Sequence, residues 1–428
     1  MLDAVLIDIK ERLRDKNIHE VRTVARAVGV SSPTEGKKDD IIADILAIAT
    51  CEIDPAPRST RGAPPKSSDY DEELVADILR YREQCAAINA EGANSGFEVS
   101  DGTSYVRCAG ILDKNYLRVK GCLPDSGDVY VGESFINRFK LRDGDFIEGS
   151  YMRKQPSPML VQIVSVNGYP PQAIRRRDFA ALTPIYPKKR IHIANSQGIV
   201  ARQVDLFAPV GYGQRAVISA PANSCKTELL KQIASGISSS EEASVIIFVV
   251  AGSPEEVTDL SRSAEFARVF HTDFYANSEE HVRAAEFIAR YCKTAVESEE
   301  DVVLIVDGLS KLGAAAKHVL SSAICAEEGG SLTVIATVCA EGEYSSEYSA
   351  ELLGAANMRV TLLEGPSQVP AIDVSKTYTL NCGLLQSDRE QKTADILRKQ
   401  YKQTGDLTPI AELFKKTENN TEIIDKNG

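Results

Sequence analysis

The sequence has little of what metal centres, disulfide frameworks and membrane spans require. Its nine cysteines include no CxxC pair, and none of its five histidines stands at metal-ligand spacing from another ligand. No apolar run approaches the roughly 20 residues that cross a bilayer, and the opening MLDAVLIDIKERL lacks the basic, apolar and small-residue regions of a signal peptide. We therefore expect a cytoplasmic protein with no membrane partner, no zinc site and no disulfide framework.

Charge narrows the range of partners. The 428 residues carry a formal net charge of −12, with 43% hydrophobic and 26% charged residues. This composition is typical of a globular chain with several domains. Proteins that coat nucleic acid without sequence preference do so with many lysines and arginines. The acidic excess excludes that class, so any contact with nucleic acid has to be local.

The N-terminal part of the sequence divides into a helical module and a linker. Residues 2–15 and 39–49 have apolar residues at helical spacing, with the turn-rich GVSSPTEGKK between them. The following stretch combines four prolines with small and charged residues and cannot build a core. It is expected to be a linker that ends where a helix begins near Glu72.

Two kinds of strand pattern follow. Five short runs, YVRCAGIL, YLRV, DVYVG, DFIEGSYM and MLVQIVSV, are punctuated by Gly, Pro and Asp, which predicts a small closed barrel of the oligonucleotide-binding kind. The buried runs AVISA, SVIIFVV, DVVLIVD and LTVIATV then alternate with helical patterns, which predicts a mostly parallel sheet covered on both faces. The expected boundaries are 1–50 for a helical domain, 51–71 for the linker, 72–103 for a helix and its connection, 104–168 for the barrel, 169–205 for a connector, 206–416 for an α/β domain and 417–428 for a disordered tail.

The stretch AVISAPANSCKTELL, residues 216–230, combines a strand, a loop and the start of a helix. A phosphate loop works because backbone N–H groups and the positive end of the following helix meet the anion. Lys226 would reach the terminal phosphates of a nucleotide, and Thr227 would hold Mg²⁺. Cys225 stands where a glycine is usual, and a left-handed backbone there costs on the order of 1–2 kcal/mol. Farther on, DVVLIVD ends in Asp307, which either binds Mg²⁺ through water or caps the next helix.

The order of short motifs along the chain points to a family. LRDGD, FAALTPIYP, PVGYGQRAVISAPANSCKT, SPEEVTDL, AEEGGSLTVIAT, GAANM and VPAID follow one another. In this order they resemble the bacterial transcription termination factor Rho. The resemblance implies a hexameric, RNA-dependent ATPase that uses ATP and Mg²⁺. It also implies a RecA-like P-loop motor, an OB-fold (cold-shock-like) domain that captures cytosine-rich nascent RNA, a helical domain before it, and RNA polymerase as a further partner.

The resemblance also assigns site residues. The implied RNA-binding residues are Tyr116, Arg118, Asp128 and Tyr130. Aromatic rings stack on bases and an arginine holds phosphates or base edges, although tyrosines that only cover a barrel are the alternative. Lys114 stands where another aromatic residue is usual, and the basic runs 175–177 and 188–190 are either RNA contacts or solvated loops. The implied nucleotide-pocket residues are Gly211, Gly213, Gln214, Arg215, Asn223, Ser224, Cys225, Lys226, Thr227, Glu228 and Ser253, with Thr227 and Asp307 for Mg²⁺.

The chain departs from the family pattern at the positions used for hydrolysis. After SVIIFVV the family has Asp-Glu, whose glutamate orients the attacking water, and this chain has Ala251 and Gly252. Leu380 stands at the position of the arginine finger, since no arginine occurs between Arg359 and Arg389. General-base help is worth about 10²–10⁴ in rate and an arginine finger about 10³–10⁵. We therefore expect a nucleotide pocket that is retained in outline without its hydrolytic residues.

The two RNA-contacting loops of the central channel also differ. The segment between LSKLG and AEEGG is too short to include the family's long loop, and AEGEYSSEYSAELL, at the other loop, is acidic and has no lysine. A negative channel would repel RNA.

Three functions follow from these observations. The first is an active Rho-type termination factor in which Glu255 or Glu256 supplies the acid. The second is a catalytically degenerate paralogue that binds RNA and nucleotide and acts as a regulatory or assembly partner of an active Rho, in a mixed ring. The third is a structural oligomer that uses the RecA-like core only for self-assembly.

Overall fold

The computed structural model divides into two compact units, Met1–Arg107 and Cys108–Gly428. No helix among the described residues has both the length and the apolar character that a membrane span needs. All of the expected linker except Asp71 lies outside the described residues. The structure describes residues 9–10, 12–14, 16–30, 37–49, 71, 74–80, 97–98, 104–153, 157–174, 176–194, 198–221, 224–238, 243–264, 266–339, 347–364 and 371–427.

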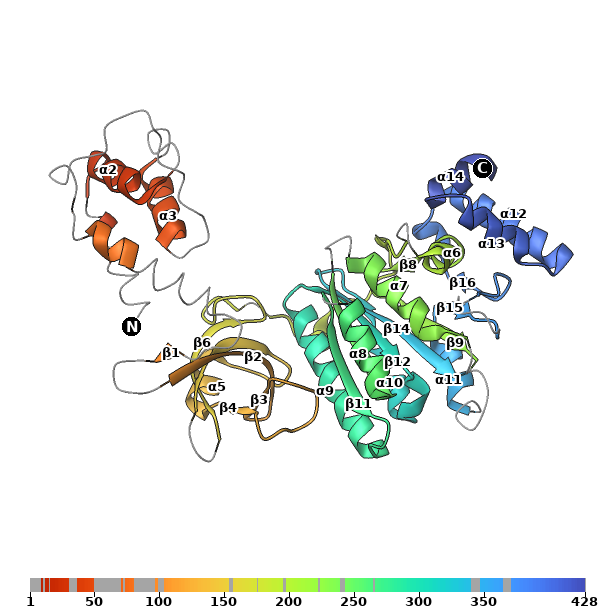
Figure 1. The fold of residues 1–428 in the computed structure, drawn as a ribbon, viewed down its shortest axis with the longest axis horizontal. Coiled ribbons are helices and arrows are strands. Elements are labelled where there is room, and N and C mark those ends of the chain that lie inside the picture. Colours follow the sequence, from red (N-terminus) through yellow and green to blue (C-terminus); the bar gives the residue numbers. More distant parts are fainter. Residues whose placement is uncertain are drawn as a thin grey trace. The chain divides into compact units, whose positions relative to one another are not determined.

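The first unit contains short helices (Figure 1), among them α2 (Ile18–Val28) and α3 (Lys38–Ala49). A capping box begins α2: the Asn17 side chain accepts hydrogen bonds from two backbone N–H groups of the first turn, and Glu20 accepts one from the Asn17 backbone. The helix ends at Gly29, whose φ of 99° lies in the left-handed region. Apolar spacing predicts the helices on either side but not α2, for which the Asn-x-x-Glu pattern is the available signal.

A small apolar core and ion pairs hold these helices together. Arg12 donates to Asp77 at 2.9 Å, and Lys16 lies 2.9 Å from Asp71. The first of these pairs joins the first helical residues to the segment 74–80, which is helical as expected. The core residues with the least exposure include Ile9, Leu13, Val21, Val24, Ala25, Ile41, Ile45, Leu74 and Ile78.

The barrel has the five strands that the sequence predicts. They pair in the order β2-β3-β4-β6-β5, and β2 also pairs with β5, which closes the sheet. In chain order β4 is the third of these strands and β6 is the fifth. The two run parallel to each other, as the third and fifth strands of an OB-fold do. A two-residue strand, β1 (Phe97–Glu98), adds to the start of β2. The barrel elements are β2 (Ser104–Asp113), β3 (Tyr116–Arg118), β4 (Val129–Tyr130), α5 (Glu133–Phe139), β5 (Phe146–Met152) and β6 (Met159–Val166).

The larger sheet is the expected parallel one. Its parallel strands run in the order β11-β10-β12-β14-β9-β15, and β13 and β16 add antiparallel pairings. Its strands are β9 (Arg215–Ala220), β10 (Ser244–Gly252), β11 (Arg268–Asp273), β12 (Asp301–Asp307), β13 (Ile324–Cys325), β14 (Ser331–Cys339), β15 (Met358–Thr361) and β16 (Tyr378–Thr379), and a separate ribbon pairs β7 (Arg190–Ile191) with β8 (Val210–Gly211).

Helices cover both faces of this sheet (Figure 1). Within β12, Val303 and Ile305 belong to one apolar cluster, and Val302, Leu304 and Val306 belong to the other. Successive side chains of a strand point to opposite faces, so a continuous apolar run means burial on both. The helices of this region are α6 (Ile199–Phe207), α7 (Lys226–Ser238), α8 (Pro254–Ser263), α9 (Ser278–Glu297), α10 (Ala315–Ser321) and α11 (Glu347–Ala355), with 3₁₀ turns η2 (Phe179–Ala181), η3 (Leu309–Leu312) and η4 (Cys382–Leu384).

The C-terminal segment is helical, so the prediction of a disordered tail over 417–428 is wrong. Figure 1 shows α12 (Asp388–Thr404), α13 (Thr408–Lys415) and α14 (Asn420–Asn427) gathered near α6. In α14 the side chain of Ile423 is fully buried and joins the same apolar cluster as Phe414. Tertiary burial therefore orders a segment whose composition alone favours disorder.

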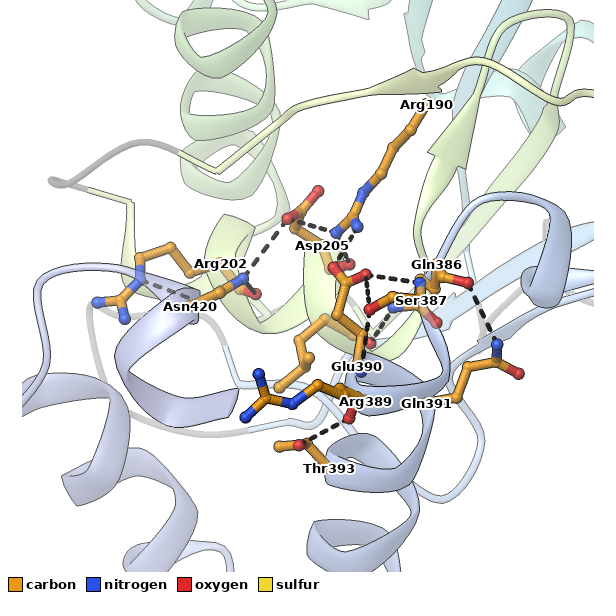
Figure 2. A network of polar contacts seen from close by, with 11 residues as sticks. Arg190, Arg202, Asp205, Gln386, Ser387, Arg389, Glu390, Gln391, Thr393 and Asn420 are labelled. Carbon is orange, nitrogen blue, oxygen red and sulfur yellow. Dashed lines mark hydrogen bonds and ion pairs between the residues drawn. The ribbon is translucent and has the colours of Figure 1, made fainter. Parts of the chain in front are cut away.

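Polar contacts tie these helices to the sheet domain (Figure 2). The Arg190 guanidinium donates to the Asp205 carboxylate at 2.7 Å and to Glu390 of α12. The Arg202 guanidinium, also buried, donates to Asn420 of α14 at 3.3 Å and to the Thr417 carbonyl at 2.6 Å. Arg190 belongs to the basic run 188–190, which the sequence leaves open as either an RNA contact or a solvated loop. Its buried partners give Arg190 a structural role instead of the exposed position that an RNA contact needs.

Candidate nucleotide and RNA sites

The phosphate loop lies between β9 and α7. It follows Ala220, the last residue of β9, and ends where α7 begins at Lys226. Ser224 is buried and donates to the Pro221 carbonyl at 2.7 Å, so its hydroxyl supports the loop from behind. Cys225 has a φ of 51°, the left-handed conformation that the missing glycine predicts. A side chain in this conformation adds a strain of about 1–2 kcal/mol.

Lys226 and Asp307 lie together at one edge of the sheet. The parallel strands β9 and β12 end at the same edge of the sheet, with β14 between them. The Lys226 ammonium lies 3.0 and 3.1 Å from the two carboxylate oxygens of Asp307, which is buried. Thr337 donates to Asp307 at 2.7 Å and accepts from the Gly308 N–H at 2.8 Å. The carboxylate is therefore fixed beside the loop lysine rather than capping the next helical turn.

The donor set at this edge suits Mg²⁺. A hard cation prefers carboxylate and hydroxyl oxygens, and Asp307 offers the former while Thr227, in the first turn of α7, offers the latter. Among the described residues there is no cluster of three or more His, Cys, Asp and Glu side chains that could hold a metal by itself. A metal at this edge would therefore depend on the nucleotide for its other ligands.

Several residues expected at the pocket serve elsewhere. Gly211, Gly213 and Gln214 precede β9 and Arg215 is its first residue, so the length of this six-residue strand separates them from the phosphate loop by about 20 Å. Gln214 and Arg215 bond instead to Asn357. The resemblance suggests a turn beside the phosphates, and the direction of β9 places that turn at the other edge of the sheet.

Three other expected residues have different outcomes. Ser253 is the N-cap of α8 and accepts from the Glu256 N–H at 3.2 Å. Glu228 lies in the first turn of α7, where it accepts from Gln232 at 3.3 Å. Asn223 lies outside the described residues.

At Gly252, the expected position of the water-orienting acid, a side chain would collide with its neighbours unless they shift. Gly252 ends β10, and a Cβ atom there would lie 2.6 Å from Val249 Cγ1 and 3.2 Å from Val257 Cγ2. The carboxylate of Glu256 accepts from the Ser253 N–H at 3.3 Å in the capping box of α8. That bond engages one of the two acids that could substitute for the missing glutamate.

A lysine that the sequence analysis did not single out holds this strand end. The Lys311 ammonium donates to the carbonyl oxygens of Val250 at 2.9 Å and Ala251 at 3.3 Å. Burial lowers the pKa of Lys311, and the charge of Lys226 lowers it further. The region that usually carries an acid is thus faced by a second lysine. Sequence periodicity gives no signal for Lys311, because the role of this lysine depends on its contact with β10, which is distant in the sequence.

Thr272 of the neighbouring strand β11 supports the same strand end, together with a buried histidine of α9, His281. The hydroxyl of Thr272 accepts from the Ala251 N–H at 3.1 Å and lies 2.8 Å from His281 Nδ1. Burial lowers the pKa of His281, and the charge of Lys311 acts in the same direction. A neutral imidazole can accept the hydroxyl proton at Nδ1, which completes the chain of hydrogen bonds.

The finger and channel positions are described only in part. Leu380 follows β16 and is 54% exposed, with its N–H donating to the Asn357 carbonyl at 2.8 Å. Between β12 and β14 the chain forms η3, α10 and β13. The acidic channel segment, residues 340–346, lies outside the described residues.

The barrel presents the two expected tyrosines together. Tyr116 of β3 pairs in register with Tyr130 of β4, and their ring centroids lie 5.6 Å apart in an edge-to-face arrangement. Tyr116 is 38% exposed. Tyr130 is half-buried, and an aromatic pair with one exposed ring on neighbouring barrel strands can stack nucleic-acid bases.

Arg118 and Asp128 are largely engaged with each other. The Arg118 side chain is 8% exposed and forms ion pairs with Asp128 and, at 2.7 Å, with Asp113. Asp113 also lies 3.8 Å from Arg290 of α9, which links the barrel to the sheet domain. Sequence reasoning assigned Arg118 and Asp128 to RNA but missed Asp113, which holds the guanidinium.

Fold and geometry define a class: an oligonucleotide-binding barrel joined to a P-loop nucleotide-binding domain. Two family models match the chain, "Rho termination factor, RNA-binding domain" over residues 101–172 and "ATP synthase alpha/beta family, nucleotide-binding domain" over residues 200–324. Relatives named transcription termination factor Rho match over much of their length. The protein from Streptomyces coelicolor is 33% identical over 68% of this chain and 78% of its own, the one from Bacillus subtilis 31% over 72% and 81%, and the one from Cereibacter sphaeroides 30% over 90% and 96%. This chain belongs to the Rho family.

Proposed function

We propose that this protein is a Rho-type transcription termination factor of the cytoplasm that binds RNA through its barrel and ATP through its phosphate loop, while its own site hydrolyses ATP poorly. The observation that carries the proposal is the contrast between two positions at the edge of the sheet where the parallel strands end. Lys226 and Asp307 are in bonding contact at the phosphate loop, whereas Gly252 leaves no room for the acid that orients water.

Nucleotide binding rests on the residues at the carboxyl end of β9. Backbone N–H groups of the loop and the N-terminus of α7 would hold the phosphates. Lys226 would turn from Asp307 to the terminal phosphates, and Thr227 with Asp307 would hold Mg²⁺. Bound Mg²⁺ would neutralise charge on the phosphate oxygens. Without an acid at Gly252, the attacking water has no base, a loss of about 10²–10⁴ in rate.

RNA binding rests on the barrel. Tyr116 and Tyr130 would stack two bases of a single strand. Arg118 and Asp128 would read the edge of a cytosine, since an arginine donates to ring acceptors and a carboxylate accepts from the exocyclic amine. Cytosine-rich nascent RNA is therefore the proposed ligand. Because Arg118 is already paired with Asp113, we expect it to bind the cytosine edge more weakly than an arginine without such a partner would.

The proposed assembly is a hexameric ring, either of this chain alone or mixed with an active Rho, on RNA that RNA polymerase is making. Exposed Leu380, at the finger position, supports a regulatory role in a mixed ring, because this subunit would supply a leucine where its neighbour's nucleotide needs a guanidinium. In that role the chain slows a ring that it joins.

Binding measurements on the full chain test the proposal. Wild-type protein is expected to bind Mg-ATP and a cytosine-rich oligonucleotide, and Lys226→Ala to lose only the nucleotide. Lys231→Ala, a change to another lysine of α7, is the matched control and should bind both. The proposal is refuted if the wild type fails to bind Mg-ATP or fails to bind the oligonucleotide. Adding the chain to an active Rho should lower its RNA-dependent ATPase rate, and an unchanged rate excludes the regulatory role.

A further inference from the structure

A cavity of about 310 Å³ lies between the barrel and the sheet domain, away from both sites described above. Its lining includes residues of β5, the turn after β6, the starts of β10 and β11, and α9. The starts of these parallel strands are at the opposite edge of the sheet from the phosphate loop. The volume is at the lower end of the range for ligand pockets, about 300–1,000 Å³.

One arginine and three aromatic rings line this cavity. The Arg268 guanidinium carbon lies 3.6 Å from the ring centre of Phe146 and 5.5 Å from that of Tyr291, and the guanidinium donates to the Tyr291 hydroxyl. The rings fix the plane of the guanidinium, which leaves its remaining N–H groups in a set direction. Phe266, which also lines the cavity, is 46% exposed. A planar ligand would find both a flat surface and oriented donors here.

A carboxylate faces the same space without a direct partner. Glu300 lines the cavity, and within the described part of the chain its side chain forms neither a hydrogen bond nor an ion pair. Burial raises the pKa of Glu300, and the charge of Arg268 opposes that change. The charges of Arg268 and Glu300 interact electrostatically, but the two side chains form no ion pair. A molecule that presents an acceptor beside a donor would bridge them.

We propose that this cavity binds a free nucleobase or nucleoside that carries an exocyclic amino group, which means cytosine, adenine or guanine. Each of these bases offers a hydrogen-bond acceptor next to an amino donor, which matches Arg268 and Glu300 on the cavity wall, whereas uracil has no amino group. The charged lining residues are Arg268, Glu148 and Glu300, so acidic groups outnumber basic ones. That balance disfavours phosphate groups and favours the neutral nucleoside over an RNA strand. The inference is independent of the nucleotide site at Lys226.

Titration of the full chain with the four ribonucleosides tests the assignment. Calorimetry or tyrosine fluorescence can follow binding, since Tyr291 lines the cavity and the chain has no tryptophan. Cytidine, adenosine or guanosine is expected to saturate a site at millimolar concentration or below, and uridine, which has no amino group, to bind more weakly. Glu300→Gln should weaken binding by about 10–100-fold, the effect of a hydrogen bond to a charged group. Glu286→Gln, on the exposed face of α9, is the matched control and should bind like the wild type.

Each outcome decides the matter. The inference is overturned if no nucleoside saturates the wild type, or if a folded Glu300→Gln variant, checked by circular dichroism, binds as the wild type does. If Glu300→Gln does not fold, Arg268→Gln is measured instead, and unchanged nucleoside binding by that variant overturns the inference. If only a cytosine-rich oligonucleotide binds and loses affinity with Glu300→Gln, the cavity belongs to the RNA path and the nucleoside assignment is wrong.

Discussion

Substitutions at the end of β10 test whether the acid position is sterically closed. A Cβ on Gly252 would lie 2.6 Å from Val249 Cγ1, well inside normal contact distance. Overpacking of this kind costs about 1–3 kcal/mol, so Gly252→Ala should lower the free energy of unfolding by that amount. Val249 is buried, and Val249→Ala should cost about 1–3 kcal/mol through the cavity that it leaves. The double variant should lose less than the sum, by about 1–2 kcal/mol, because each change relieves the other.

The assay is urea unfolding of the full chain followed by far-ultraviolet circular dichroism, with midpoints compared at constant slope. Gly354→Ala, in α11, is the matched control: nothing lies within 4 Å of the added Cβ, and the change should be neutral or stabilising. Two results would refute the reasoning: a Gly252→Ala variant as stable as the wild type, or strictly additive effects in the double variant. The same geometry predicts that Gly252→Glu folds well only with Val249→Ala.

Three further predictions concern the barrel, a buried histidine and the C-terminal helix. Tyr116→Ala should weaken binding of a cytosine-rich oligonucleotide by about 1–3 kcal/mol, measured by fluorescence anisotropy, while the same change at exposed Tyr186 should not. Because burial lowers the pKa of His281 below its ordinary 6.5, the unfolded chain binds the proton more tightly; the contribution of the neutral ring to stability is present above pH 6.5 and lost as the pH falls below it. His281→Gln should flatten this pH dependence in thermal unfolding, and an unchanged slope would contradict it. Ile423→Ala should cost about 2–4 kcal/mol in urea unfolding, and the same change at half-exposed Ile396 much less; equal losses would mean that α14 is not packed as described.

Much of the architecture could be predicted from local pattern. Strand runs of β-branched residues between helical periods are enough to place Lys226 and Asp307, because parallel strands end at one edge of a sheet. The barrel follows from short, punctuated strands. The backbone at the last residue of the phosphate loop also follows, since Cys225 takes the left-handed conformation of the glycine that it replaces.

What could not be predicted depends on partners far away in sequence. The tail looks disordered until Ile423 is seen in the core. Arg118 looks available for RNA until Asp113 is seen beside it. The turn at Gly211–Arg215 looks close to the phosphates until the direction of β9 separates them. Asn17 shows the opposite case, because its capping box with Glu20 was legible in the sequence and would have predicted α2.

Binding and hydrolysis of ATP, measured on one sample of the full chain with and without cytosine-rich RNA, test the central claim most directly. Our account predicts that the wild type binds Mg-ATP, that Lys226→Ala does not, and that both release phosphate at the same background rate. RNA-stimulated phosphate release by the wild type above the Lys226→Ala rate would contradict it.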